Sequence, residues 1–320
     1  MPALTFVVPP ENDGISVYNF LRAKCGVSYR LIKKLKRVPL GITSNGIHIR
    51  TIDPLHGGDI VRLNIPEDEN PTMPVEIPIN IIYEDGHIAV INKPSGMPVH
   101  PAREHVADTL ANAFSAHLIA AGEPNSAFRV INRLDRDTSG LVLTAKNSHA
   151  ASLLHGHTEK IYYAICQGTL TGNGTIDAPI RIMEGHGIQR EVGEGGIRAV
   201  THWRAVRNLS VTAPSGNSYD LTFLEIHLET GRTHQIRVHF SSLGMPLAGD
   251  DMYGGSRELI SRQALHCGQL DFRHPITGEK MRFSVPLHVA MAIIRAETLV
   301  PNDSECNRSR IVAPSLVRTR

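Results

Sequence analysis

The spacing of hydrophobic residues changes along the chain. Between positions 15 and 35 they recur three or four residues apart, as on one face of a helix. They are Ile15, Val17, Phe20, Leu21, Val27, Leu31, Ile32 and Leu35. After Pro39, short apolar runs surround a turn signal at Asn45 and Gly46. The pattern predicts two short helices followed by short strands, a small α+β domain over residues 12–66.

A linker is predicted next, over residues 67–78. This stretch is acidic and rich in proline, and it has no apolar period that would place it in a core. The change of pattern on either side of it marks a domain boundary.

From residue 79 onward the apolar runs are short and broken by glycine and proline, as in strands. They cover 81–84, 87–92, 128–132, 141–145, 160–165 and 221–228. Helical spacing is clear only over 108–121 and 148–157, so strands and helices do not alternate as in a doubly wound parallel sheet. The class predicted is α+β with a mainly antiparallel, mixed sheet over residues 79–298. Residues 301–320 lack aromatic residues and are expected to form a disordered tail.

Composition narrows the class of protein. No apolar run approaches the ~20 residues of a membrane-spanning helix, and no secretory leader is recognisable, so we expect a cytoplasmic protein and take a monomer as the default. The four cysteines form no CxxC pair, which argues against a disulfide framework or a zinc ribbon. The closest histidine pairs, His155 with His157 and His234 with His239, lack helical i, i+4 spacing, so no metal site is predicted.

The charge is distributed unevenly. The net charge of +2 identifies no partner, but residues 22–37 hold seven basic side chains and no acidic one. The basic side chains are Arg22, Lys24, Arg30, Lys33, Lys34, Lys36 and Arg37. Two interpretations remain open from the residues alone, a phosphate-binding surface and an ordinary solvated helix face.

The densest polar cluster, Asn132–Gly140, lies between two predicted strands and places Asp135 on a loop. Its spacing imitates the start of a calcium-binding loop, but the twelfth position is Lys146 where a bidentate glutamate is needed. A turn in which Asp135 caps its own backbone is the other interpretation.

A second cluster covers Thr230–His239. Residues 234–240 alternate like a strand, yet Gly244 and Pro246 mark the end of a helix. We predict a helix that begins near Thr233. Arg237 would then lie in the first turn, where the helix dipole disfavours a cation and a nearby anion is needed. Asp135 or an RNA phosphate could supply it, and a surface arginine is the alternative.

Five motifs in order resemble those of the RluA-like family of pseudouridine synthases, over about residues 79–288. They are residues 82–85 with 92–101, the loop 132–140, the strand 160–168, the segment 230–239 and the segment 265–279. Residues 12–66 are similar, more weakly, to a small RNA-binding module named after a small-subunit ribosomal protein.

The resemblance implies residue roles. Asp135 would be the catalytic aspartate, Tyr162 the site tyrosine and Arg237 the arginine that pairs with the aspartate. Arg133 would occupy the space that the target base leaves in the RNA helix. The chain departs from the family pattern at Asn132, where many members have histidine, and we expect an effect on substrate positioning. The N-terminal RNA contacts would come from Lys33, Lys34, Lys36 and Arg37.

The implied reaction breaks the bond between uracil and ribose, turns the base and joins it through carbon 5, so no redox cofactor is required. The carboxylate could attack the anomeric carbon or remove a ribose proton, and both routes remain open. Tyr162 could stack under the uracil and help remove the proton from carbon 5. A paired uridine must first leave its stack, at a cost of a few kcal/mol.

The implied substrate is structured RNA, with ribosomal RNA favoured over transfer RNA. Two functions from other classes remain open, a non-catalytic RNA-binding protein of the same fold and a hydrolase or glycosylase that releases free base.

Overall fold

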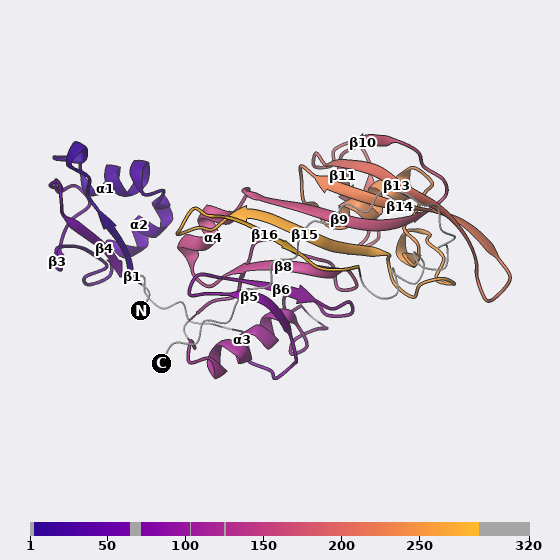
Figure 1. The fold of residues 1–320 in the computed structure, drawn as a ribbon, viewed down its shortest axis with the longest axis horizontal. Coiled ribbons are helices and arrows are strands. Elements are labelled where there is room, and N and C mark those ends of the chain that lie inside the picture. The colour runs from indigo at the N-terminus through magenta and orange to yellow at the C-terminus, as the bar shows by residue number, and fades with distance from the viewer. Residues whose placement is uncertain (1–2, 65–71, 103, 125, 288–320) are drawn as a thin grey trace, which may run out of the picture.

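The computed structural model describes residues 3–64, 72–102, 104–124 and 126–287. Two sheets with separate hydrophobic clusters build two units (Figure 1). Helices are few and short beside the larger sheet, and nearly all strand pairs are antiparallel. The predicted α+β class with a mainly antiparallel, mixed sheet is therefore confirmed.

The N-terminal unit is a four-stranded antiparallel sheet in the order β1-β4-β2-β3, with short helices. Its elements are β1 (Ala3–Val7), α1 (Val17–Asn19) with a π-helical turn (Phe20–Lys24), α2 (Tyr29–Leu35), β2 (Ile42–Ser44), β3 (Ile47–His48) and β4 (Ile60–Asn64). The hydroxyls of Ser16 and Ser28 cap the two helices. Strand β1 lies before residue 12, where the predicted domain begins. The prediction missed this strand because five residues are too few for a period of two to be recognised alone.

The second unit contains a ten-stranded sheet in the order β10-β13-β14-β9-β15-β8-β6-β5, with β16 paired to β15 and β7 to β8. Its elements are β5 (Asn80–Glu84), β6 (Ile88–Lys93), α3 (Leu110–Ala120), β7 (Arg129–Val130), β8 (Ser139–Ala145), α4 (Ser148–Leu154), β9 (Thr158–Gln167), β10 (Asn173–Asp177), β11 (Ile180–Ile182), β12 (Arg190–Val192), β13 (Val200–Thr212), β14 (Ser218–Leu228), α5 (Gln235–Ser242), β15 (Leu265–Arg273) and β16 (Lys280–Ser284). β11 and β12 form a separate hairpin.

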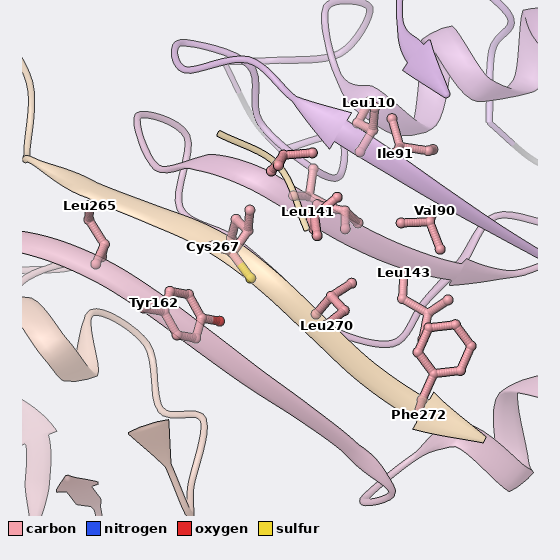
Figure 2. Packing of buried hydrophobic residues seen from close by; sticks show 14 of the residues in the cluster. Val90, Ile91, Leu110, Leu141, Leu143, Tyr162, Leu265, Cys267, Leu270 and Phe272 are labelled. Atoms are coloured by element: carbon pink, nitrogen blue, oxygen red, sulfur yellow. The ribbon is translucent and has the colours of Figure 1, made fainter. Parts of the chain in front are cut away.

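The main core packs on the central strands. Figure 2 shows apolar side chains of β6, β8, β9 and β15 meeting in one layer, with Leu110 of α3 next to Ile91. Leu141, Leu143 and Cys267 in this layer are almost completely buried. Burial on this scale makes the centre of the sheet a rigid support for the loops at its edge.

The parallel strand pairing within the large sheet depends on a glycine. β8 and β15 are parallel and pair only through Ser139 with His266 and Gly140 with Cys267. Gly140 has φ +113°, and a Cβ at this position would lie 2.2 Å from the carbonyl oxygen of Cys267. Only glycine fits here. The loop that carries Asp135 therefore enters the sheet at a fixed point.

The second half of the predicted linker is attached to α3. The amide of Asn112 donates to the carbonyl of Met73 at 2.8 Å, and the hydroxyl of Ser115 donates to that of Thr72 at 3.1 Å. Residues 72–78 therefore belong to the second unit, while the first part of the predicted linker lies outside the described residues. The predicted tail 301–320 and residues 288–298 lie outside them too. Within the described part, no helix has the length and apolar character needed to cross a membrane.

Candidate active site

A cavity of about 620 Å³ opens where the loop before β8, strand β9 and helix α5 meet. Asp135, Tyr162 and Arg237 all line it, although they lie far apart in the sequence. The structure thus brings the three implied catalytic residues to one place.

The loop that holds Asp135 is fixed from two sides. The backbone carbonyl of Asp135 accepts from the amide of Thr138 at 3.1 Å, and Gln263 donates to the Thr138 hydroxyl at 3.3 Å. The ammonium of Lys93 donates to the carbonyl of Arg136 at 2.9 Å and to the carbonyls of two further residues.

Lys93 lies in the first motif, where no pattern of the sequence indicates a role for it. Its side chain is completely buried. Burial lowers the pKa of Lys93 to about 7, although the charges of Asp137 and Asp135 act in the opposite direction. The three carbonyls replace the water that an ammonium normally binds.

Arg237 binds two carboxylates. Its Nε and Nη2 donate to Asp250 at 2.7 and 2.8 Å, and its Nη1 donates to Asp135 at 3.2 Å. The Arg237 side chain is 7% exposed and that of Asp250 is 0% exposed, so the interpretation as a surface arginine is wrong. The anion expected near the helix start is present twice, and the more intimate partner is Asp250.

The surroundings of Arg237 maintain its charge. Burial lowers its pKa, but the hydrogen bonds and charge of Asp250, together with Asp135, outweigh this effect and raise the pKa above its ordinary value. The guanidinium also lies 4.9 Å from the ring centre of Tyr253, in cation–π geometry. A permanent cation therefore faces the Asp135 carboxylate, whose side chain is 26% exposed.

The alternation of β9 separates its two tyrosines. Tyr162 faces the cavity and lies beside Cys267 of the neighbouring strand β15 (Figure 2). Tyr163 points to the other face and stacks on Phe223 with ring centres 5.8 Å apart. Burial raises the pKa of Tyr162 well above its usual value, so its hydroxyl stays protonated.

Comparison with known proteins identifies the chain. Residues 87–242 match the family model of RNA pseudouridylate synthase. The uncharacterized RNA pseudouridine synthase YjbO of Bacillus subtilis (strain 168) is 40% identical over 281 residues, which cover 85% of this chain and 96% of that protein. The chain belongs to the RNA pseudouridine synthase family.

A second relative agrees with this assignment, and a solved structure shares the fold. The ribosomal large subunit pseudouridine synthase D of Pseudomonas aeruginosa is 38% identical over 270 residues, 77% of this chain and 80% of that protein. The solved structure of human RNA pseudouridylate synthase domain containing 1 covers 71% of this chain and 97% of its own, with a TM-score of 0.53 at 22% identity. The resemblance to the RluA-like synthases is confirmed, whereas the likeness of the N-terminal unit to a ribosomal protein module stays a prediction.

Arg133 of the synthase is exposed and lines two cavities. The second has a volume of about 450 Å³ and lies against the β11–β12 hairpin. Three more arginines line it, Arg181, Arg190 and Arg232. The sequence does not single out these three, because they are spread over some fifty residues and no local charge run marks them.

Asn132 is tied to the backbone of the synthase. Its amide donates to the carbonyl of Leu141 at 3.0 Å and accepts from the amide of Leu143 at 2.8 Å. The residue is buried, and both bonds fix the start of the loop to β8. An effect of Asn132 on the substrate would therefore act through the position of this loop.

The basic residues of the N-terminal unit lie outside the cavity. On α2, Leu31, Ile32 and Leu35 are buried while Lys33 and Lys34 are exposed. Lys36 and Arg37 follow the helix and are also exposed. Among the described residues of the synthase, no group of three or more His, Cys, Asp or Glu side chains has metal-binding geometry.

Proposed function

We propose that this synthase isomerises chosen uridines in structured RNA, with Asp135 as the essential carboxylate. The observation that carries the proposal is the pair formed by Asp135 and Arg237 in the wall of the cavity, at 3.2 Å. A carboxylate that is partly accessible and held by a buried cation can act on the ribose of a uridine that enters the cavity.

Breaking the glycosidic bond creates opposite charges on the sugar and on the base, and the protein must stabilise both. When the bond from N1 to C1′ breaks, its electron pair remains on the uracil and the ribose becomes electron-deficient. Asp135 can bond to C1′ and be displaced when C5 joins C1′, or it can remove a proton from the sugar and give it back afterwards. C5 then loses its proton and N1 takes one up, so both routes restore the carboxylate. Uridine and pseudouridine have the same composition, so the reaction needs no oxidant or reductant.

Tyr162 is proposed to support the uracil by stacking. Its ring lines the cavity on the same strand face as Lys160, two residues earlier. Because burial raises the pKa of Tyr162, a tyrosinate that removes the proton from C5 is disfavoured. The stacking part of the expectation for Tyr162 is therefore the part that we retain.

Structured RNA fits the arginines around the site. A uridine must be turned out of its stack before it can reach Asp135, and we propose that the exposed Arg133, which lines the cavity, occupies the space it leaves. The second cavity, with Arg181, Arg190 and Arg232, suits the phosphates beside the target. The exposed lysines of α2 would add contacts of the same kind.

Ribosomal RNA is the favoured substrate, because a relative at 38% identity is named as a synthase for the large ribosomal subunit. Transfer RNA is the second candidate. We further propose that the protein acts in the cytoplasm as a monomer, and that the isomerisation needs no cofactor or metal.

The test is a map of pseudouridines in cellular RNA with and without the gene, complemented by wild type or by Asp135→Asn. Wild type should restore each lost site and Asp135→Asn none, at equal protein level. Restoration by the variant would contradict the role of Asp135. Free uracil released from a purified RNA substrate would identify a glycosylase, and RNA binding without any change of the RNA would identify a non-catalytic protein.

A further inference from the structure

We propose that His234 is a further catalytic residue, whose Nε2–H donates a hydrogen bond to a carbonyl oxygen of the uracil as it leaves the ribose. The inference rests on the proposed function, because it concerns the same cavity. His234 lines this cavity together with Asp135 and Arg237. It belongs to the second polar cluster of the sequence, where its spacing from His239 raises only the question of a metal ligand.

The backbone of His234 is strained. Its φ of 57° and ψ of 18° lie in the left-handed region, which few residues other than glycine adopt, histidine among the more frequent of them. Such a conformation costs free energy and often accompanies a functional constraint. The residue is the N-cap of α5, yet its side chain makes no capping bond.

Another residue stabilises the start of this helix. The side-chain oxygen of Gln235 accepts from the amide of Arg232 and from the hydroxyl of Thr230, both at 2.9 Å. Its amide nitrogen donates to the carbonyl of Val200 at 2.9 Å. With the chain held through Gln235, the imidazole of His234 is available for another purpose.

Tyr253 fixes the tautomer of that imidazole. The hydroxyl oxygen of Tyr253 accepts from the backbone amide of Arg190 at 3.0 Å and lies 2.8 Å from Nδ1 of His234. Because the hydroxyl oxygen already accepts from Arg190, we infer that its hydrogen goes to Nδ1. Nδ1 is then an acceptor and the remaining hydrogen of a neutral ring is on Nε2.

The ring is neutral for a physical reason. Burial lowers the pKa of His234, as do the positive charges of Arg237 and Arg190, although Asp135 and Asp250 act in the opposite direction. Nε2 has no hydrogen-bond partner among the described residues. A neutral ring therefore presents a free N–H donor in the wall of the cavity.

The chemistry requires such a donor. Breaking the bond from N1 to C1′ leaves the electron pair on uracil, where the charge is shared by the ring nitrogen and the two carbonyl oxygens. A fixed donor aimed at one of these oxygens stabilises that charge more than it stabilises neutral uridine, which is how a donor lowers a barrier. No proton is transferred to or from His234. After C5 has joined C1′, the C5 proton leaves to water and N1 takes up a proton, so the composition of the nucleoside is unchanged.

Two donors close to Asp135 are already engaged. Arg237 uses its nitrogens on Asp250 and Asp135, and Lys93 behind the loop uses its ammonium on three carbonyls. Arg133 and Lys160 also line the cavity, on long side chains, whereas the imidazole of His234 is held by the hydroxyl of Tyr253.

The first test measures the tautomer in the free protein. Nitrogen-15 NMR of the imidazoles in the full-length chain should show His234 with hydrogen on Nε2, and Tyr253→Phe should populate the other tautomer. Hydrogen on Nδ1 in wild type would overturn the proposal. This measurement needs no RNA, so its outcome does not depend on the proposed function.

The second test measures single-turnover pseudouridine formation on an in vitro transcript of large-subunit ribosomal RNA that wild type modifies. Asparagine tolerates the left-handed backbone, but its side chain is too short to place a donor where Nε2 of His234 lies. His234→Asn should therefore lower the rate constant by about 100-fold and change the Kd for RNA by less than about threefold. His234→Gln restores a donor of similar reach and should recover at least tenfold. His157→Ala, an exposed histidine outside the cavity, is the control.

Three outcomes would refute the role of His234 while leaving the proposed function intact. They are a His234→Asn rate within about threefold of wild type, a loss confined to Kd, and a His234→Gln rate no higher than that of His234→Asn when both variants melt like wild type. A wild type that modifies no RNA would instead refute the proposed function itself.

Discussion

The guanidinium of Arg237 is shared unequally between two carboxylates, with two bonds to Asp250 at 2.7 and 2.8 Å and one to Asp135 at 3.2 Å. Asp250 is completely buried and Asp135 remains partly exposed. Asp250 therefore acts as the structural partner of the cation, which leaves Asp135 accessible to a substrate while it stays beside a positive charge.

This division predicts a large effect at Asp250. Asp250→Ala leaves a buried guanidinium without its main counter-charge, and the free energy of unfolding should fall by about 3–5 kcal/mol. Urea denaturation of the variant and of wild type measures this difference in the free energy of unfolding. The neighbouring Asp251→Ala removes an exposed ion pair with Arg257 and should cost less than about 1 kcal/mol. Similar values for the two variants would show that Asp250 does not have this structural role.

Gly140 offers a test of how the sheet positions Asp135. Gly140→Ala puts a methyl group 2.2 Å from the carbonyl of Cys267 and forces alanine to φ +113°. β8 must move away from β15, and the loop moves with it. We expect the free energy of unfolding to fall by about 1–3 kcal/mol or more. The single-turnover rate should also fall under conditions in which the variant is folded. Gly216→Ala, also at positive φ but with open space around it, controls for backbone strain. Equal rates in the two variants would argue against this mechanism.

The sequence predicts the residues of the candidate site better than it predicts the residues and strands that hold them in position. Asp135 and Arg237 lie in motifs, but Asp250 follows Arg237 by thirteen residues, and nothing local shows which acid of this segment turns inward. Helix α5, expected from near Thr233, begins at Gln235, because the left-handed His234 cannot be part of it. Strand β13 is absent from the prediction, since polar and apolar side chains follow one another along it without a clear period of two and its pairing with β14 is not visible in a local pattern.

The buried His149 leads us to expect that the folded protein loses stability in acid. This histidine is buried on α4, and its Nδ1 has no hydrogen-bond partner among the residues that the structure describes. Burial, aided by the charge of His87, lowers its pKa to about 4 from 6.5. Between these values the unfolded chain binds more protons than the folded one, so stability falls as the pH falls from about 6.5 to 4. The shift corresponds to at most about 3 kcal/mol.

Denaturation at a series of pH values checks this sign. His149→Leu removes the titrating group, so its free energy of unfolding should depend less on pH than that of wild type between pH 6.5 and 4. Exposed His186→Leu is the matched control and should follow wild type. If His149→Leu has the same slope as wild type in this range, the ring is not buried in its neutral form.

The lysines after Tyr29 test whether the N-terminal unit contacts phosphates. Lys33, Lys34 and Lys36 are exposed beside a buried apolar face, so their replacement by glutamine should leave that unit folded. Each phosphate that a lysine no longer neutralises lowers the slope of log Kd against log salt by about 1, and the slope of the triple variant should therefore fall by about 2–3. The Kd for RNA should rise most at low salt.

Total charge must be separated from position. Replacing Arg257, Arg273 and Lys280 by glutamine removes the same charge from exposed positions of the second unit. If the N-terminal unit binds the phosphates, only the lysine variant changes the slope markedly, while both keep the single-turnover rate at saturating RNA. Equal slopes in the two variants would mean that these lysines act through net charge alone, as on an ordinary solvated helix face.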